Sequence, residues 1–295
     1  MKLIFATLLF SVSALAQVQP IEEIFSPNEA NYPLAKFTKV AVIQWNPQMS
    51  APIGVPAATV EKYMQNNRNS IAQYVKEAAK NGAELVTTAE FATVGYPDIP
   101  ELPDEEDNFR NREDLKPFVE TIPGPSTKYF SALAKELKVT LHIGLAEVDS
   151  TTKNYHNTVV VIGPDGAIIT KYRKMHLYQM EENFLVPGKS AVTYTTKNLG
   201  KVGIAICSDI YSSQPMTDYA SAKLNLLAIS TSWASYNSGW SYFKSAATRV
   251  RAYTTAANQE YFPDSGVLNP DGTTQSHIRQ SNGLAYGFVP RPKSR

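Results

Sequence analysis

The chain has only one cysteine, Cys207, among its 295 residues, which excludes any intrachain disulfide. It has little net charge: 28 basic and 27 acidic side chains leave +1, so no global field attracts nucleic acid or an anionic membrane. It also lacks internal repeats, zinc-type Cys/His spacing, a glycine-rich phosphate loop and any Asn-x-Ser/Thr glycosylation sequon. These absences favour a small molecule as the partner and exclude nucleic acid.

The N-terminus has the pattern of a secretory signal peptide. Met1-Lys2 is followed by an apolar stretch over 3–10 and by the small-x-small triplet Ala14-Leu15-Ala16. The alternatives are a core helix or a membrane anchor, but the apolar stretch is far shorter than the ~20 residues that span a bilayer. We therefore predict a signal peptide over 1–16, an N-terminal extension over 17–36, and a secreted or periplasmic protein without a membrane anchor.

A lone thiol in an exported protein is either a buried apolar filler or a reactive group. Taken by itself, Cys207 fits the filler interpretation better, because free cysteine is among the most buried residue types. The residues around Cys207 must therefore distinguish a buried filler from a reactive thiol.

Apolar strand patterns and helical patterns alternate along the chain, and the 43% apolar composition can bury one large core. We predict one domain with helices outside and sheets inside. The predicted strands cover 40–44, 85–88, 140–145, 158–162, 167–170, 202–206, 226–230, 252–258 and 266–268, and the predicted helices cover 58–80, 126–137, 216–224 and 242–249. The long segment 91–125 has little periodicity, and we assign its acidic stretch 101–106 to a solvated surface.

Three residues able to act as acid, base and nucleophile follow apolar strands directly: Glu90, Lys174 and Cys207. Ligands bind at the carboxyl ends of strands in layered α/β folds, so the three side chains could converge there. A thiolate is a nucleophile, a nearby ammonium lowers the pKa of a thiol, and a carboxylate can relay its proton. Each residue alone also fits a structural role, as a helix cap, a surface lysine or packing.

The motifs around these three residues resemble the nitrilase superfamily of carbon–nitrogen hydrolases. The matching segments are Ala89-Glu90-Phe91 with Gly95-Tyr96-Pro97, then 172–177, then 203–210, then Thr231-Ser232-Trp233, in the order of the family. The resemblance implies a four-layer α-β-β-α sandwich of the nitrilase type in a domain over 37–295 with a C-terminal tail. It also implies a Glu90–Lys174–Cys207 triad, no metal or organic cofactor, and a homo-oligomer such as a dimer.

The resemblance further implies a supporting glutamate that holds the lysine, for which Glu181 fits best and Glu182 is the alternative. It places the oxyanion of the tetrahedral intermediate near Lys174 and the backbone N–H of Ser208. Tyr96, His176 and Trp233 stand beside the motifs and are candidates for the substrate pocket, with ordinary core packing as their alternative.

The segments 112–125, 174–187 and 207–210 look most similar to the vanin/biotinidase branch, which cleaves linear secondary amides such as pantetheine and biotinyl-lysine. That branch has a bulky aromatic residue where Ser208 stands here. From this resemblance we expect a secreted hydrolase of linear amides that is similar to pantetheinase or biotinidase.

Three alternatives remain open. One is a nitrilase proper, although nitrile-cleaving members place a Trp-Glu pair where this chain has Ser208-Asp209. Another is a papain-like protease, whose glycine and tryptophan context around the nucleophile is missing. The last is a non-catalytic protein that binds an amide or acyl ligand.

Overall fold

The computed structural model describes residues 21–47, 49–98, 109–233, 239–259, 264–279 and 282–293. The predicted signal peptide and the acidic stretch 101–106 lie outside these residues.

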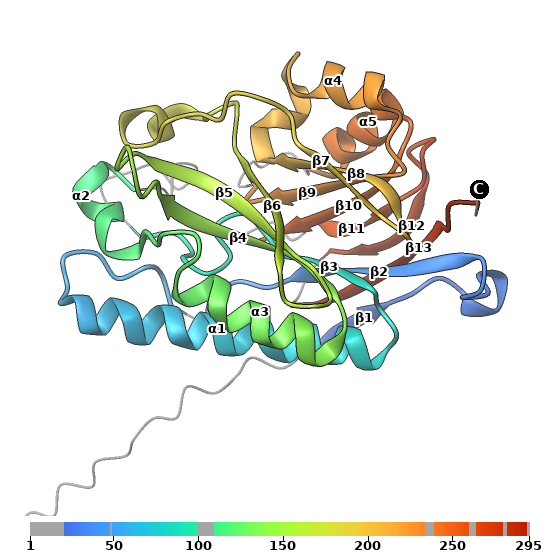
Figure 1. Ribbon diagram of the computed structural model, residues 1–295, viewed down its shortest axis with the longest axis horizontal. Coiled ribbons are helices and arrows are strands. Elements are labelled where there is room, and N and C mark those ends of the chain that lie inside the picture. The colour runs from blue at the N-terminus through green and yellow to red at the C-terminus, as the bar shows by residue number, and fades with distance from the viewer. Residues whose placement is uncertain are drawn as a thin grey trace, which may run out of the picture.

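Two β-sheets face each other and helices cover their outer faces, which confirms the predicted four-layer α-β-β-α sandwich in a single domain (Figure 1). The seven-stranded sheet has the order β1 (Glu23–Phe25), β13 (Gly283–Pro290), β2 (Phe37–Gln44), β3 (Leu85–Thr87), β4 (Thr140–Val148), β5 (Tyr155–Ile162), β6 (Ile168–Arg173). The six-stranded sheet has the order β12 (Thr274–Ile278), β11 (Ser265–Leu268), β10 (Tyr253–Asn258), β9 (Leu226–Thr231), β8 (Gly200–Ile206), β7 (Thr193–Thr196).

The helices form the two outer layers (Figure 1). The α-helices are α1 (Ala57–Lys80), α2 (Arg112–Leu115), α3 (Pro125–Leu137), α4 (Met216–Ala222) and α5 (Trp240–Val250). Short 3₁₀ turns accompany them in the described part of the chain: η1 (Glu29–Asn31), η3 (Lys116–Phe118), η4 (Gln179–Asn183) and η5 (Cys207–Tyr211). Among the described residues, no helix is long and apolar enough to cross a membrane.

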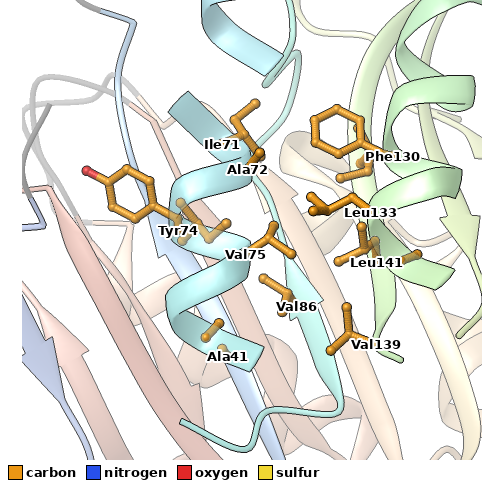
Figure 2. Packing of buried hydrophobic residues seen from close by; sticks show 14 of the residues in the cluster. Ala41, Ile71, Ala72, Tyr74, Val75, Val86, Phe130, Leu133, Val139 and Leu141 are labelled. Atoms are coloured by element: carbon orange, nitrogen blue, oxygen red, sulfur yellow. The ribbon is translucent and has the colours of Figure 1, made fainter. Parts of the chain in front are cut away.

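The period-two alternation of the strands explains the layering. In β2, Ala41 and Ile43 pack against α1 and α3, whereas Val40 and Val42 pack between the two sheets. Figure 2 shows the first of these clusters, where side chains of α1 and α3 meet those of the central strands. Both faces of β2 are therefore buried, as its continuous apolar sequence predicts.

Helix α1 has the bounds that its sequence predicts. Its buried residues recur every three or four positions, from Val60 to Ala78, and form one face toward the sheet. The helix ends where Gly82 takes a positive φ of 83°, and the N–H of Ala83 then bonds to the carbonyl of Ala78.

Strand directions bring the candidate residues to one end of the sandwich. β3 and β4 are parallel, β5 is antiparallel to β4, and β6 is antiparallel to β5, so β6 runs in the direction of β3. In the other sheet β8 and β9 are parallel. The backbone of Glu90, which follows β3, bonds to the carbonyl of Thr231 at the end of β9. The segments after β3, β6, β8 and β9 therefore share one edge.

The sequence pattern predicted no strand after residue 268, and this prediction is wrong. β12 and β13 follow, and β13 is an interior strand that pairs with β1 on one side and β2 on the other. Its two glycines conceal it in the sequence, yet the packing requires at least one of them, because a Cβ at Gly287 would lie 2.3 Å from a methyl of Val267. The edge strands β1 and β7 were also not predicted.

Candidate active site

The predicted Glu90, Lys174 and Glu181 form one buried ion cluster. The Nζ of Lys174 lies 2.8 Å from Oε1 of Glu90 and 2.6 Å from Oε2 of Glu181. All three side chains are at most 2% exposed. The neighbouring Glu182 is exposed, so the geometry selects Glu181 as the carboxylate that holds the lysine.

Asn157 completes this cluster, and the sequence analysis missed it. Its amide nitrogen donates to Oε1 of Glu90 at 2.6 Å and to Oε1 of Glu181 at 3.0 Å. Its backbone carbonyl also accepts the N–H of Lys174 at 2.9 Å. Asn157 lies near the start of the antiparallel strand β5, whereas the residues predicted from the sequence follow the ends of strands. The antiparallel hairpin of β5 and β6 is what carries this residue to the same edge.

Cys207 stands where β8 turns into η5, and this residue is partly buried, whereas the ion cluster is fully buried. Its φ of 43° lies in the left-handed region, which a residue with a Cβ rarely adopts. Backbone strain of this kind persists only where the surroundings impose it, and it occurs frequently at active sites. The turn places the thiol close enough to Glu90 and Lys174 for both charges to act on its pKa.

Asp209 holds this turn against the segment that carries Lys174. Its Oδ2 accepts the N–H of Ile206 at 2.9 Å and the hydroxyl of Tyr172 at 2.8 Å. Its Oδ1 accepts the N–H groups of Met175 and His176 at 3.2 and 2.9 Å. A single fully buried carboxylate thus ties both sides of the site together, and its burial raises its pKa to about 6.

The buried cluster holds two carboxylates and one ammonium. Burial raises the pKa of Glu90, Lys174 opposes this rise, and the negative charge of Glu181 adds to it. Burial also disfavours the ammonium of Lys174, but Glu181 and Glu90 together outweigh it and raise the pKa of Lys174 well above its usual range. Lys174 is therefore a fixed cation, and Glu90 is a carboxylate that can accept a proton.

The expected lowering of the Cys207 pKa by a nearby ammonium is wrong as a net effect. Lys174 does act in that direction, but burial and the charge of Glu90 are stronger and raise the pKa of the thiol to about 12. Cys207 is therefore a thiol at neutral pH, so it would need a base to take its proton in order to act as a nucleophile. Glu90, with its raised pKa, has the proton affinity for this step.

The other predicted residues have distinct positions. The Ser208 hydroxyl donates to the carbonyl of His176 at 2.6 Å, while its backbone N–H lies in the first turn of η5, where N–H groups lack an intrahelical acceptor. His176 is exposed and Trp233 is half-buried, and Tyr96 packs on Phe91 with ring centroids 5.7 Å apart. In the described part of the chain, no three His, Cys, Asp or Glu side chains are arranged to hold a metal ion.

A family model described as carbon–nitrogen hydrolase matches residues 39–280. The chain belongs to the carbon–nitrogen hydrolase family. This assignment places it in the nitrilase superfamily, as the motifs around Glu90, Lys174 and Cys207 predicted.

Relatives of this carbon–nitrogen hydrolase include a nitrilase of Pyrococcus abyssi, 34% identical over 58% of this chain and 56% of the relative. An omega-amidase NIT2-B of Xenopus laevis is 31% identical over 57% of this chain and 58% of the relative. The chain thus spans little more than half the length of these first relatives. An omega-amidase NIT2 of Danio rerio is 28% identical over 78% of this chain and 84% of its own.

Solved structures support the fold of this carbon–nitrogen hydrolase. An amidase from Nesterenkonia sp. has a TM-score of 0.69 at 17% identity and covers 89% of this chain and 94% of its own. Nit3 of Saccharomyces cerevisiae, a member of branch 10 of the nitrilase superfamily, has a TM-score of 0.69 at 22% identity. The match covers 86% of this chain and 90% of Nit3. At these identities the similarity concerns the fold alone.

We expect the Asn157→Ala variant of this carbon–nitrogen hydrolase to lose about tenfold in kcat/KM, since a hydrogen bond to a charged group is worth more than one between neutral groups. The hydrogen bond from Asn157 lowers the pKa of Glu90, so its loss should move the acid limb of the pH profile to higher pH. Asn198→Ala is the matched control, because its amide donates to Glu84 at 2.6 Å, a contact outside the ion cluster. An unchanged pH profile in Asn157→Ala would contradict the assigned role.

Proposed function

We propose that this chain hydrolyses linear amides through a thioester on Cys207. The observation that carries the proposal is the buried Glu90–Lys174–Glu181 cluster beside the thiol of Cys207, which lies on a strained turn. It supplies a base, a fixed cation and a nucleophile at one edge of the sandwich. Family membership supports the same reaction class.

In the first half of the reaction, Sγ of Cys207 attacks the amide carbon while Glu90 takes the thiol proton. Oε1 of Glu90 already accepts bonds from Asn157 and Lys174, whereas Oε2 accepts one from the N–H of Ser232 at 2.9 Å. Oε2 is therefore the oxygen with room for the proton. The transfer moves negative charge from Glu90 to the sulfur, which removes the repulsion between the carboxylates of Glu90 and Glu181.

The tetrahedral intermediate places a negative charge on the former carbonyl oxygen. Of the three protons of the Lys174 ammonium, two face Glu90 and Glu181, and the third can face this oxygen together with the N–H of Ser208. The C–N bond then breaks and the amine leaves with the proton from Glu90. Water next attacks the thioester while Glu90 takes its proton, and the C–S bond breaks to return the thiol and a free acid.

The substrate within the class of linear amides is the finer part of the proposal. The relatives reported above carry the names nitrilase, amidase and omega-amidase. We keep the vanin/biotinidase similarity as a prediction carried by the sequence motifs, and pantetheine and biotinyl-lysine are its test compounds.

A panel of primary amides, secondary amides and nitriles, with detection of ammonia or amine, tests the function. We expect turnover of amides and, during turnover, a mass increase on Cys207 equal to the acyl group. Exclusive turnover of nitriles would favour the nitrilase alternative. Ligand binding without an adduct or turnover would favour the binding protein and refute the proposal.

Export and a homodimer also remain proposals. The signal-peptide prediction rests on residues 1–16, which lie outside the described residues, and the dimer rests on the resemblance.

A further inference from the structure

Four aromatic side chains from four parts of the chain gather next to the segments that carry the site. We call them the aromatic rim: His176, Tyr211, Trp233 and Tyr242. Tyr211 is the hub, with ring centroids 6.2 Å from His176, 6.0 Å from Trp233 and 6.2 Å from Tyr242, mostly in edge-to-face geometry. The ring centroids of Trp233 and Tyr242 lie 4.8 Å apart. Such spacings are typical of aromatic pairs that attract each other.

The rim residues lie on the same chain segments as the residues of the candidate site. His176 lies two residues after Lys174 and its N–H bonds to Asp209. Tyr211 ends η5, the turn that Cys207 begins. Trp233 follows Ser232, whose N–H bonds to Glu90.

The rim combines a rigid base with exposed rings. Trp233 packs edge-on against Phe243, which is fully buried, at 5.9 Å. A Cβ at Gly239 would lie 2.9 Å from the ring of Phe243 and 3.0 Å from that of Trp233, so glycine allows this packing. Tyr211 and Tyr242 nevertheless stay 45% and 43% exposed. Large aromatic side chains that remain exposed beside a candidate site are available for a ligand.

The ion cluster beside the rim disfavours an anionic ligand. It contains two carboxylates and one ammonium, and both carboxylates bind that ammonium. The guanidinium of Arg249 on α5 donates to the carbonyls of Ser212 and Ser213, directly after Tyr211, so these N–H groups are directed at the backbone. A carboxylate that enters the site would be repelled by Glu90 and Glu181 and would compete with them for Lys174, whereas an uncharged ring would not.

We infer that the aromatic rim is a subsite for a flat, uncharged ring on the amide substrate, and that it selects against substrates with a carboxylate. The inference rests on the proposed function, because it names the substrate class of that site. It assigns Tyr211 and Tyr242 a role in specificity that their positions in the sequence do not suggest.

Binding to the Cys207→Ala variant tests the subsite without turnover. Isothermal titration calorimetry measures the binding of three primary amides. 4-Phenylbutanamide has a ring, butanamide has only a short chain, and 5-amino-5-oxopentanoate has a carboxylate. We expect 4-phenylbutanamide to bind about tenfold more tightly than butanamide, since aromatic pairs add to the burial of the ring area. The carboxylate compound should bind more weakly than butanamide.

Adding Tyr211→Ala or Tyr242→Ala to the Cys207→Ala variant should reduce the ratio of the two affinities, 4-phenylbutanamide over butanamide, several-fold. Tyr129→Ala, on α3 in the opposite outer layer, should leave the ratio unchanged. Equal affinities for the two amides, or tightest binding of the carboxylate, would overturn the subsite. Ring-selective binding combined with no amide turnover in the wild-type protein would instead support the subsite and refute the proposed reaction.

Discussion

Cys207→Ala should lower amide turnover by at least ~10⁴-fold, because covalent catalysis fails completely without its nucleophile. The loss should appear in kcat, with no acyl adduct detectable by mass spectrometry under conditions where the wild-type protein is labelled. The fold should persist, since the bonds that hold this turn run through the backbone and Asp209 rather than through the thiol.

Ser221→Ala is a suitable control for this substitution. Ser221 is an exposed residue of α4, and its loss should leave both turnover and melting temperature unchanged. Wild-type turnover by Cys207→Ala would show that a different group attacks the amide. Cooperative unfolding of both variants at similar temperatures would confirm that the lost activity reflects chemistry.

Glu90→Gln should lower kcat by about 10³-fold, because an amide cannot relay the protons that the carboxylate carries in both halves of the reaction. The glutamine also fits its surroundings poorly. Oε1 of Glu90 faces the donors of Asn157 and Lys174, and Oε2 faces the N–H of Ser232, so either orientation of the new NH₂ group opposes a donor. We therefore expect some loss of stability as well.

The pH profile separates the two effects of Glu90→Gln. Burial raises the pKa of Glu90, and the base acts only when ionised, so wild-type kcat/KM should fall as the pH drops through a value above that of an ordinary glutamate. This acid limb should disappear in Glu90→Gln, which a purely structural defect would not cause. Glu182→Gln, at the exposed neighbour of Glu181, should keep the wild-type profile. Retention of the limb in Glu90→Gln would exclude Glu90 as the base.

Local pattern was enough to predict most of the sandwich. Continuous apolar stretches such as 40–44 and 202–206 are strands buried on both faces, and the amphipathic period of 58–80 is helix α1. Such elements are recognisable because burial on both faces, or on one helical face, requires a composition that neighbouring residues already display. β13 escaped recognition because its two glycines weaken the strand pattern, although close packing favours both: Gly283 lies against Glu23 of β1 and Gly287 against Val267 of β11.

By itself, the sequence determined the family and the identity of three residues able to do the chemistry, Glu90, Lys174 and Cys207, since each follows a recognisable strand within a motif. Only the tertiary structure decided what surrounds them. Asn157 reaches the cluster through the antiparallel pairing of β5 and β6, and Tyr211 and Trp233 meet across two loops. The tertiary structure also sets the pKa of Cys207, because burial and the negative charge of Glu90 outweigh the nearby ammonium of Lys174.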